Sequence, residues 1–275
     1  MIPNYLKSAA RNLLRDKTNA LISIVGLAIG IACCMLIGIY IRDELSYNRF
    51  NNGIKEIYRV NWITKDNNGI NTGASTPVPF SQNLQAKIPD IDKIARLYQR
   101  SGEMESDDPV GAGKQRFQEQ GIYFADNDFF NIFVNHFQEG DPNSALASPN
   151  AVVITEEMGH KYFGTDNPLG KTLLYENKWP LKITGVVEKM PLSSDIKFDF
   201  LISFETVFSV ETPAFAEFVR NDWTFTPCET WIRLKPVGNV QKTELALKRH
   251  LHENGSERNH EMNTVRLQPL TDIHL

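Results

Sequence analysis

The sequence predicts an α+β protein with one N-terminal transmembrane helix followed by a mixed α/β extracytoplasmic domain. Three observations support this prediction. The stretch from Ala20 to Ile41 has no charged side chain. A short basic segment precedes it, and short strand patterns alternate with short helix patterns after it. We therefore expect a basic interfacial helix over residues 1–18, a transmembrane helix over 19–44 and a folded domain over 45–275.

The apolar stretch is long enough to cross a bilayer. At 1.5 Å per residue it gives about 33 Å of helix, against a hydrocarbon thickness of roughly 30 Å. A signal peptide is the alternative, but its apolar core has roughly 7 to 15 residues and ends at a small-x-small cleavage site. Here the stretch ends in the bulky Ile39, Tyr40 and Ile41, followed by charged residues. A retained membrane helix is therefore favoured.

The segment before the apolar stretch carries a basic stripe. Lys7, Arg11, Arg15 and Lys17 lie there, with only Asp16 opposing them. The spacing of four between Lys7, Arg11 and Arg15 predicts a short helix whose basic side faces lipid head groups, and an ordinary basic membrane flank is the alternative. The positive-inside rule then predicts a cytoplasmic N-terminus and an extracytoplasmic location for residues after about 45.

Small residues recur every four positions inside the apolar stretch, at Gly26, Gly30, Cys34 and Gly38. Such a stripe lets another helix approach closely, so these four residues are candidate helix-packing positions. No second apolar run of comparable length exists in the sequence. The packing partner must therefore come from a second copy, another protein or a further part of the same chain.

The composition of the remainder limits its function. After residue 41 there are 25 basic against 32 acidic side chains, a net charge of −7. This balance argues against nucleic acid as a partner, because phosphate binding needs basic surface. Cys228 is the only cysteine beyond the apolar stretch, so a disulfide within the domain is excluded. We expect the part after residue 45 to fold as a soluble monomer.

The domain is expected to mix short strands and helices. Strands are predicted over residues 57–64, 94–99, 115–124, 151–154, 172–175, 181–187, 198–203 and 230–234. The strands over residues 94–99 and 115–124 are expected to form one hairpin, and those over residues 172–175 and 181–187 another. A surface helix is predicted over residues 240–252.

Three further helices are predicted from their end signals. One begins with Thr76 as N-cap and Pro77 in the first position, with Leu84 and Ile88 on its inner face. Another is capped by Thr155 and ends at a glycine, and a third starts after residue 126. The third carries an aromatic stripe that we assign to core packing, formed by Phe129, Phe130, Phe133 and Phe137.

No catalytic or cofactor motif emerges from the sequence. The stretch from Gly164 to Thr172 has five residues between its glycines, where a phosphate-binding loop needs four. A helix is expected before it and a strand after it, which reverses the order that such a loop requires. His250, His252 and His260 lack the spacing of a zinc hydrolase and are expected at a solvated helix end. We therefore expect no enzyme, no metal and no cofactor.

Several segments, taken in order along the chain, resemble MacB/FtsX-type ABC transporter permeases. They are "ARNLLRDKTNALISIVGLAIGIACC" (10–34), "IRDELSYNRF" (41–50), "IYRV" (57–60), "STPVPFSQNLQAKIPDI" (75–91), "FADNDFFNIF" (124–133), "VVITEEMGHKYFGTDNPLGKTL" (152–173), "KITGVVEKMPLSSDIKFDFLISF" (182–204) and "LQPLTDIHL" (267–275). The resemblance implies the first membrane helix and the periplasmic core domain of such a permease.

The resemblance also implies partners and a location. It places the chain in a bacterial inner membrane with the domain in the periplasm, beside a cytoplasmic ABC ATPase and a second permease copy. Movement would pass from the ATPase outward, a mode called mechanotransmission. Further membrane helices usually follow in such permeases, so the chain is expected to be a fragment. The alternative is a single-pass anchored binding module or sensor, which later apolar spans would exclude. The cargo stays open.

Overall fold

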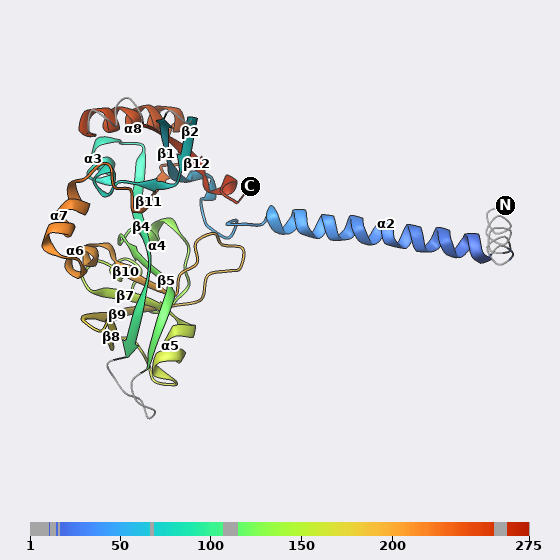
Figure 1. Cartoon of the computed structure of the whole chain (residues 1–275), viewed down its shortest axis with the longest axis horizontal. Coiled ribbons are helices and arrows are strands. Elements are labelled where there is room, and N and C mark those ends of the chain that lie inside the picture. The colour runs from blue at the N-terminus through green and yellow to red at the C-terminus, as the bar shows by residue number, and fades with distance from the viewer. Residues whose placement is uncertain are drawn as a thin grey trace. The chain divides into compact units, whose positions relative to one another are not determined.

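The computed structural model describes residues 11, 15, 17–66, 69–106, 115–255 and 263–274. The chain forms two compact units, Met1–Tyr47 and Asn48–Leu275. The first contains helix α2 (Lys17–Glu44), and the second contains all the described strands (Figure 1). The segment bounds expected from the sequence, 1–18, 19–44 and 45–275, stay predictions.

Helix α2 has 28 residues and spans about 42 Å at 1.5 Å per residue. None of its residues is buried within the chain. By length and composition it is suited to cross a membrane, and it is the only described helix that is. The apolar helix expected from the sequence is therefore present.

The second unit is built on one mixed sheet with the order β12-β1-β11-β4-β5-β10-β7-β9-β6. β10 runs parallel to β5 and β7 runs parallel to β9, whereas the other described pairs are antiparallel. The strands are β1 (Ile57–Asp66), β2 (Gly69–Gly73), β3 (Ser75–Thr76), β4 (Ile91–Ser106), β5 (Arg116–Ala125), β6 (Phe137–Gly140), β7 (Ala151–Thr155), β8 (Thr172–Tyr175), β9 (Trp179–Val187), β10 (Phe200–Ser203), β11 (Cys228–Leu234) and β12 (Asn263–Pro269). The mixed α/β class and both expected hairpins, β4–β5 and β8–β9, are confirmed.

Strand β4 connects the two ends of the unit (Figure 1). Residues 91–97 pair with β11, and residues 97–105 pair with β5. The part around β1, β11 and β12 has its own buried cluster, which includes Val60, Leu84 and Leu247. The part around β5, β7, β9 and β10 has buried clusters that include Phe124 and Phe129.

Short helices cover the sheet. They are α3 (Leu84–Lys87), α4 (Phe129–Ile132), α5 (Glu156–Phe163), α6 (Val207–Val210), α7 (Pro213–Asn221) and α8 (Val240–Asn254), with 3-10 turns at Ile54–Glu56, Val78–Ser81, Phe204–Thr206 and Leu270–Asp272. The end signals expected for α5 are confirmed: the Thr155 hydroxyl accepts from the Met158 N–H at 3.4 Å, and Gly164 follows the last turn. These two residues fix the helix because one satisfies a free N–H group and the other adopts a positive φ of 61°.

The helix expected from Thr76 is wrong. Thr76 lies in β3, where its hydroxyl donates to the Cys228 carbonyl at 2.9 Å and contacts the Thr230 hydroxyl at 2.7 Å. Pairing with β11 therefore uses the side chain that would have capped a helix. The helical residues that follow split into a 3-10 turn and α3, because Asn83 between them has a φ of 59°. Leu84 is buried all the same.

The prediction that all four phenylalanines lie on one helix is wrong, whereas their assignment to core packing agrees with the structure. α4 ends at Ile132 because Phe133 is extended, so Phe137 lies in β6 instead of on the helix. Phe129 and Phe133 are buried, with ring centroids 5.0 Å apart. The Phe137 ring lies 4.7 Å from that of Phe130. The rings pack on one another and on neighbouring core residues.

Candidate functional site

The four candidate helix-packing residues lie on α2. Gly26, Gly30, Cys34 and Gly38 are exposed, and a Cβ atom added at any of the three glycines would meet no atom within 4 Å apart from its chain neighbours and the backbone of its own helix turn. This face of α2 thus has room for another helix to approach closely. Its role as a packing surface stays a prediction.

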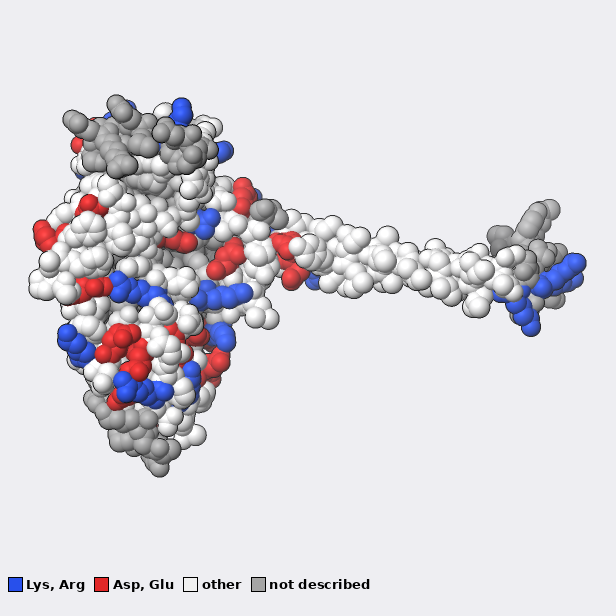
Figure 2. Space-filling view, viewed as in Figure 1, with Lys and Arg blue, Asp and Glu red and all other residues white. Residues whose placement is uncertain are grey.

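Three of the four basic residues expected at the membrane interface are among the residues that the structure describes. Arg11 and Arg15 precede α2 and Lys17 is its first residue; all three are exposed, and Lys7 lies outside the described residues. Figure 2 shows basic side chains at this end of α2, an uncharged surface along its middle, and charged side chains again at its other end, where Arg42, Asp43 and Glu44 lie. The interfacial helix itself stays a prediction.

The glycine-flanked stretch that resembles a phosphate loop joins α5 to β8. The order of helix and strand is therefore the one expected from the sequence, and it is the reverse of a phosphate-binding loop. Gly164 and Gly170 both have positive φ angles, and the Lys171 ammonium lies 3.1 Å from the Asp166 carboxylate. The stretch forms a turn between two elements.

The histidine expectation needs one correction. His250 is buried, and its Nε2 lies 3.0 Å from the Phe80 carbonyl oxygen, to which it donates. Burial and the nearby Lys87 lower its pKa. His250 faces the core because it follows Leu247 by three residues on the inner side of α8. His252 is exposed as expected, and His260 lies outside the described residues.

The two ends of the second unit meet at one carboxylate. Asn48 donates from Nδ2 to Asp195 Oδ2 at 2.6 Å, and its Oδ1 accepts from the Asp195 N–H at 3.1 Å. His274 Nδ1 lies 2.9 Å from Asp195 Oδ1. Asn48 also reaches the Leu270 carbonyl at 3.3 Å. We call Asn48, Asp195 and His274 the end junction.

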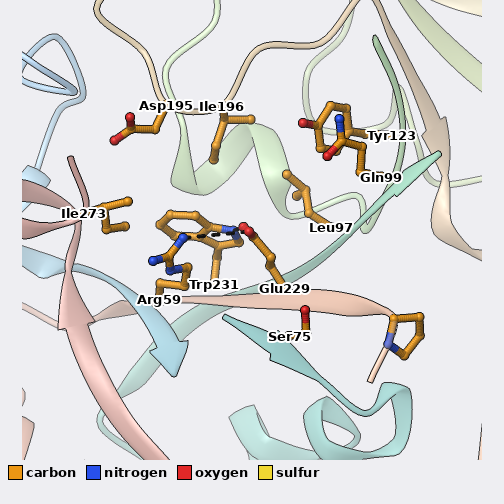
Figure 3. A pocket seen from close by; sticks show the side chains of 11 residues that line it. Arg59, Ser75, Leu97, Gln99, Tyr123, Asp195, Ile196, Glu229, Trp231 and Ile273 are labelled. Carbon is orange, nitrogen blue, oxygen red and sulfur yellow. Dashed lines mark hydrogen bonds and ion pairs between the residues drawn. The ribbon is translucent and has the colours of Figure 1, made fainter. Parts of the chain in front are cut away.

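A hollow of about 240 Å³ lies beside the end junction (Figure 3). It shares Asp195 with the junction, and its other lining residues come from strands β1, β3, β4, β5 and β11, from two loops and from the segment after the 3-10 turn Leu270–Asp272. They are Arg59, Ser75, Leu97, Gln99, Tyr123, Ile196, Pro227, Glu229, Trp231 and Ile273. Residues far apart in the sequence thus form one site.

Glu229 and Arg59 dominate the electrostatics of the hollow. The Trp231 indole N–H donates to Glu229 Oε2 at 3.0 Å, whereas Arg59 Nη1 stays 3.8 Å from Glu229 Oε1 (Figure 3). Burial raises the pKa of Glu229, and Asp195 adds to the rise while Arg59 opposes it. Arg59 is anchored from Nη2 to Gln268 Oε1 at 2.9 Å. Glu229 is therefore a carboxylate with one of its oxygens open.

Three neutral polar side chains complete the hollow. Ser75, Gln99 and Tyr123 have no side-chain hydrogen bond to any residue in the described part of the chain. Burial and the nearby Glu229 raise the pKa of Tyr123, so its hydroxyl stays protonated at neutral pH. Figure 3 shows the Tyr123 and Gln99 side chains next to each other on one side of the hollow. The hollow offers open hydrogen-bonding groups next to a charged pair.

Glu119 on β5 is a buried carboxylate whose environment differs from that of Glu229. The Lys161 ammonium donates to Glu119 Oε1 at 2.7 Å, and the Tyr162 hydroxyl donates to the same oxygen at 2.6 Å. Burial and this hydrogen bond raise the pKa of Tyr162 strongly. The Lys161 ammonium also lies 4.4 Å from the centre of the Phe117 ring. We call Glu119, Lys161 and Tyr162 the closed cluster.

Sequence reasoning missed the end junction and the hollow. One signal was present for Glu229, since it interrupts a strand whose other residues are mostly buried. Asn48 and Asp195 lie in segments that resemble the permease family, but no sequence signal predicted a contact between them. In the described part of the chain, no group of three or more His, Cys, Asp or Glu side chains is arranged to hold a metal ion. What the hollow offers chemically is binding through charge and hydrogen bonds.

Comparisons with known proteins agree with the fold. The family model of the MacB-like periplasmic core domain matches residues 20–250. A domain of a provisionally assigned permease from Porphyromonas gingivalis has a TM-score of 0.64 at 19% identity, covering 81% of this chain and 92% of that one. Among curated protein sequences, none matches the chain.

Two further solved structures share the fold. The periplasmic region of MacB from Actinobacillus actinomycetemcomitans has a TM-score of 0.54 at 17% identity, covering 82% of this chain and 94% of that one. The extracellular domain of the noncanonic ABC-type transporter YknZ from Gram-positive bacteria has a TM-score of 0.51 at 12% identity, covering 77% of this chain and 99% of that one. The chain thus combines an apolar helix with this domain, and it belongs to the family of the MacB-like periplasmic core domain, found in ABC transporter permeases.

Proposed function

We propose that this chain is part of a non-catalytic permease subunit of an ABC-type exporter or envelope-remodelling system. A partner ATPase in the cytoplasm hydrolyses ATP, and α2 passes the resulting movement to the periplasmic domain of a permease dimer. The observation that carries the proposal is the family match, which extends over both α2 and the domain. The end junction supports it, because a movement that enters at Asn48 acts directly on the carboxylate that also holds His274.

The proposal includes an orientation. The N-terminus is cytoplasmic, with Arg11, Arg15 and Lys17 at the lipid head groups, and residues after about 45 are periplasmic. The basic start of α2 supports this orientation through the positive-inside rule. A Ser101→Cys substitution in a cysteine-free background tests it. The thiol reagent cannot cross the inner membrane, and the cells are treated so that only their outer membrane is permeable. We expect the introduced cysteine to be labelled under these conditions. Labelling that occurs only after the inner membrane is ruptured would contradict the orientation.

The coupling role is tested at Gly30. Gly30→Leu fills a face of α2 that is open in this chain, so the substitution leaves the chain's own fold intact and affects only a helix packed on that face. Leu is also the better helix former, so membrane insertion is retained. Ala32→Leu is the matched control, because two residues of helix place Ala32 about 200° away from Gly30.

The measurement is the distance between spin labels at Ser101→Cys in the two copies of the full-length permease, with its ATPase, with and without ATP. We expect an ATP-dependent change in the parent and in Ala32→Leu, and loss of that change in Gly30→Leu at normal membrane levels. An unaltered response in Gly30→Leu contradicts the proposed transmission through this face.

A single-pass anchored binding module is the second candidate, and the hollow beside the end junction favours it. The two functions differ in their partner. Purification of the full-length gene product from native membranes in mild detergent brings down an ABC ATPase with vanadate-sensitive activity if the chain is a permease, and none if it is an anchored module.

A further inference from the structure

The hollow beside the end junction has an unused acceptor at its centre. Glu229 Oε2 accepts the Trp231 indole N–H at 3.0 Å, but Oε1 has no donor in the described part of the chain. Its nearest cation, Arg59 Nη1, is 3.8 Å away, beyond the usual 2.7–3.2 Å of a hydrogen bond. Arg59 is held back because its Nη2 is bonded to Gln268. The ion pair therefore leaves a place for a second donor.

The other polar groups of the hollow are suited to the same donor. Asp195 supplies a second carboxylate to the lining, and its charge acts on Glu229. The side-chain oxygens of Ser75, Gln99 and Tyr123 accept hydrogen bonds, and none of them is used within the described chain. A charged ammonium group carries three N–H donors and no acceptor, which matches a lining rich in acceptors.

The remaining walls are apolar. Leu97, Ile196 and Trp231 are nearly completely buried, and half-buried Ile273 also lines the hollow. At about 240 Å³ the hollow is below the roughly 300–1,000 Å³ of pockets for drug-sized ligands. The volume therefore suits an occupant smaller than a drug-sized ligand, and the apolar walls can contact one apolar part of it.

We propose that this hollow binds a small organic amine, with the ammonium group on Glu229 Oε1 and the apolar part against Leu97, Ile196 and Ile273. The site goes beyond the proposed transport role and does not depend on it. Because Asp195 belongs to both the hollow and the end junction, a bound amine lies beside the side chains that hold the two ends of the unit together.

The test uses the full chain in lipid nanodiscs and isothermal titration calorimetry with 2-phenylethylamine. The neutral analogue 2-phenylethanol and the anionic analogue 3-phenylpropionate have similar shapes and lack the ammonium group. Glu229→Gln removes the charge and keeps the shape of the side chain. Glu188→Gln is the matched control, since Glu188 is exposed and lies outside the hollow.

We expect saturable binding of the amine to the parent and to Glu188→Gln, and binding weakened by about tenfold or more in Glu229→Gln. Affinity for the parent should also fall as the pH is lowered through the raised pKa of Glu229, because a proton then occupies the carboxylate, and this dependence should be absent in Glu229→Gln.

Three results would overturn the proposal. Equal heats for the amine in the parent and in Glu229→Gln would show partitioning into lipid only. Equal affinity for 2-phenylethanol would show that the charge is not recognised, and this comparison holds even if Glu229→Gln fails to fold. Binding of 3-phenylpropionate that Arg59→Gln abolishes would show a site for anions instead.

Discussion

Glu119 and Glu229 are carboxylates on strands of the same sheet, but they differ in how their oxygens are used. In the closed cluster, Lys161 and Tyr162 both donate to Glu119, whose side chain is 9% exposed. In the hollow, Trp231 is the one donor to Glu229 among the described residues, and the Glu229 side chain is 36% exposed. The comparison separates a carboxylate that stabilises the fold from one that is available to a ligand. Burial of a charged side chain is therefore weak support for a binding role unless the hydrogen bonds and ion pairs within the fold leave part of that side chain free.

The largest effect is expected in the closed cluster. Glu119→Ala leaves the Tyr162 hydroxyl and the Lys161 ammonium without their acceptor, and the free energy of unfolding should fall by about 2–3 kcal/mol. For a unit of this size the midpoint of thermal unfolding should drop by roughly 4–12 °C. Circular dichroism of the full chain in detergent measures it.

Glu157→Gln is the control for that substitution. The Glu157–Lys189 ion pair is more than half exposed on both sides, so its loss should change stability by less than about 0.5 kcal/mol. If Glu119→Ala were as mild as Glu157→Gln, the closed cluster would contribute nothing special to the fold and the comparison with Glu229 would fail.

A smaller effect is expected for Tyr162→Phe. The ring stays in the core, and Glu119 keeps its bond from Lys161, so one hydrogen bond is lost and the free energy of unfolding should fall by about 1 kcal/mol. Thermal unfolding of Tyr162→Phe, Glu119→Ala and the double variant measures the coupling. Strict additivity of the two changes would refute the hydrogen bond between these side chains.

The smallest effect is expected at Glu229, and it depends on pH. Burial raises the folded-state pKa of Glu229 above its unfolded value, so the folded state holds this proton more tightly. Below the unfolded pKa the parent and Glu229→Gln should therefore be equally stable. As the pH rises through the folded pKa the parent should lose stability relative to Glu229→Gln, by less than about 0.5 kcal/mol. Chemical unfolding at several pH values checks this, and a Glu229→Gln variant that is less stable at neutral pH contradicts it.

Local signals in the sequence predicted much of the fold. Thr155 and Gly164 fix the ends of α5 through groups within one turn, and both hairpins pair neighbouring strands. Thr76 was misassigned because its hydroxyl bonds to β11, 152 residues away. His250 was misassigned although a signal existed, since Thr243, Leu247, His250 and Leu251 share one helix face.

The hollow could not be predicted from the sequence. Its charged residues, Arg59, Asp195 and Glu229, come from a strand near the start of the domain, a loop and a strand near its end. None of them is close to another in the sequence; the order of strands in the sheet brings Arg59 and Glu229 together, and the loop between β9 and β10 brings Asp195 to them. The apolar stretch was predictable for the opposite reason, because a membrane helix depends only on consecutive residues.

The end junction also determines how the domain would respond to a pulling force. When Asn48 and His274 are drawn apart, the load runs through the Asp195 side chain over a few ångströms and bypasses the ladders of the twelve-stranded sheet. The bonds at Asp195 therefore bear the load before the β1–β12 ladder, whose nearest pair is Tyr58 with Pro269. Opening of these bonds would free the segments between Asn48 and β1 and between β12 and His274, so the connection would lengthen at both ends before the strands of the sheet separate.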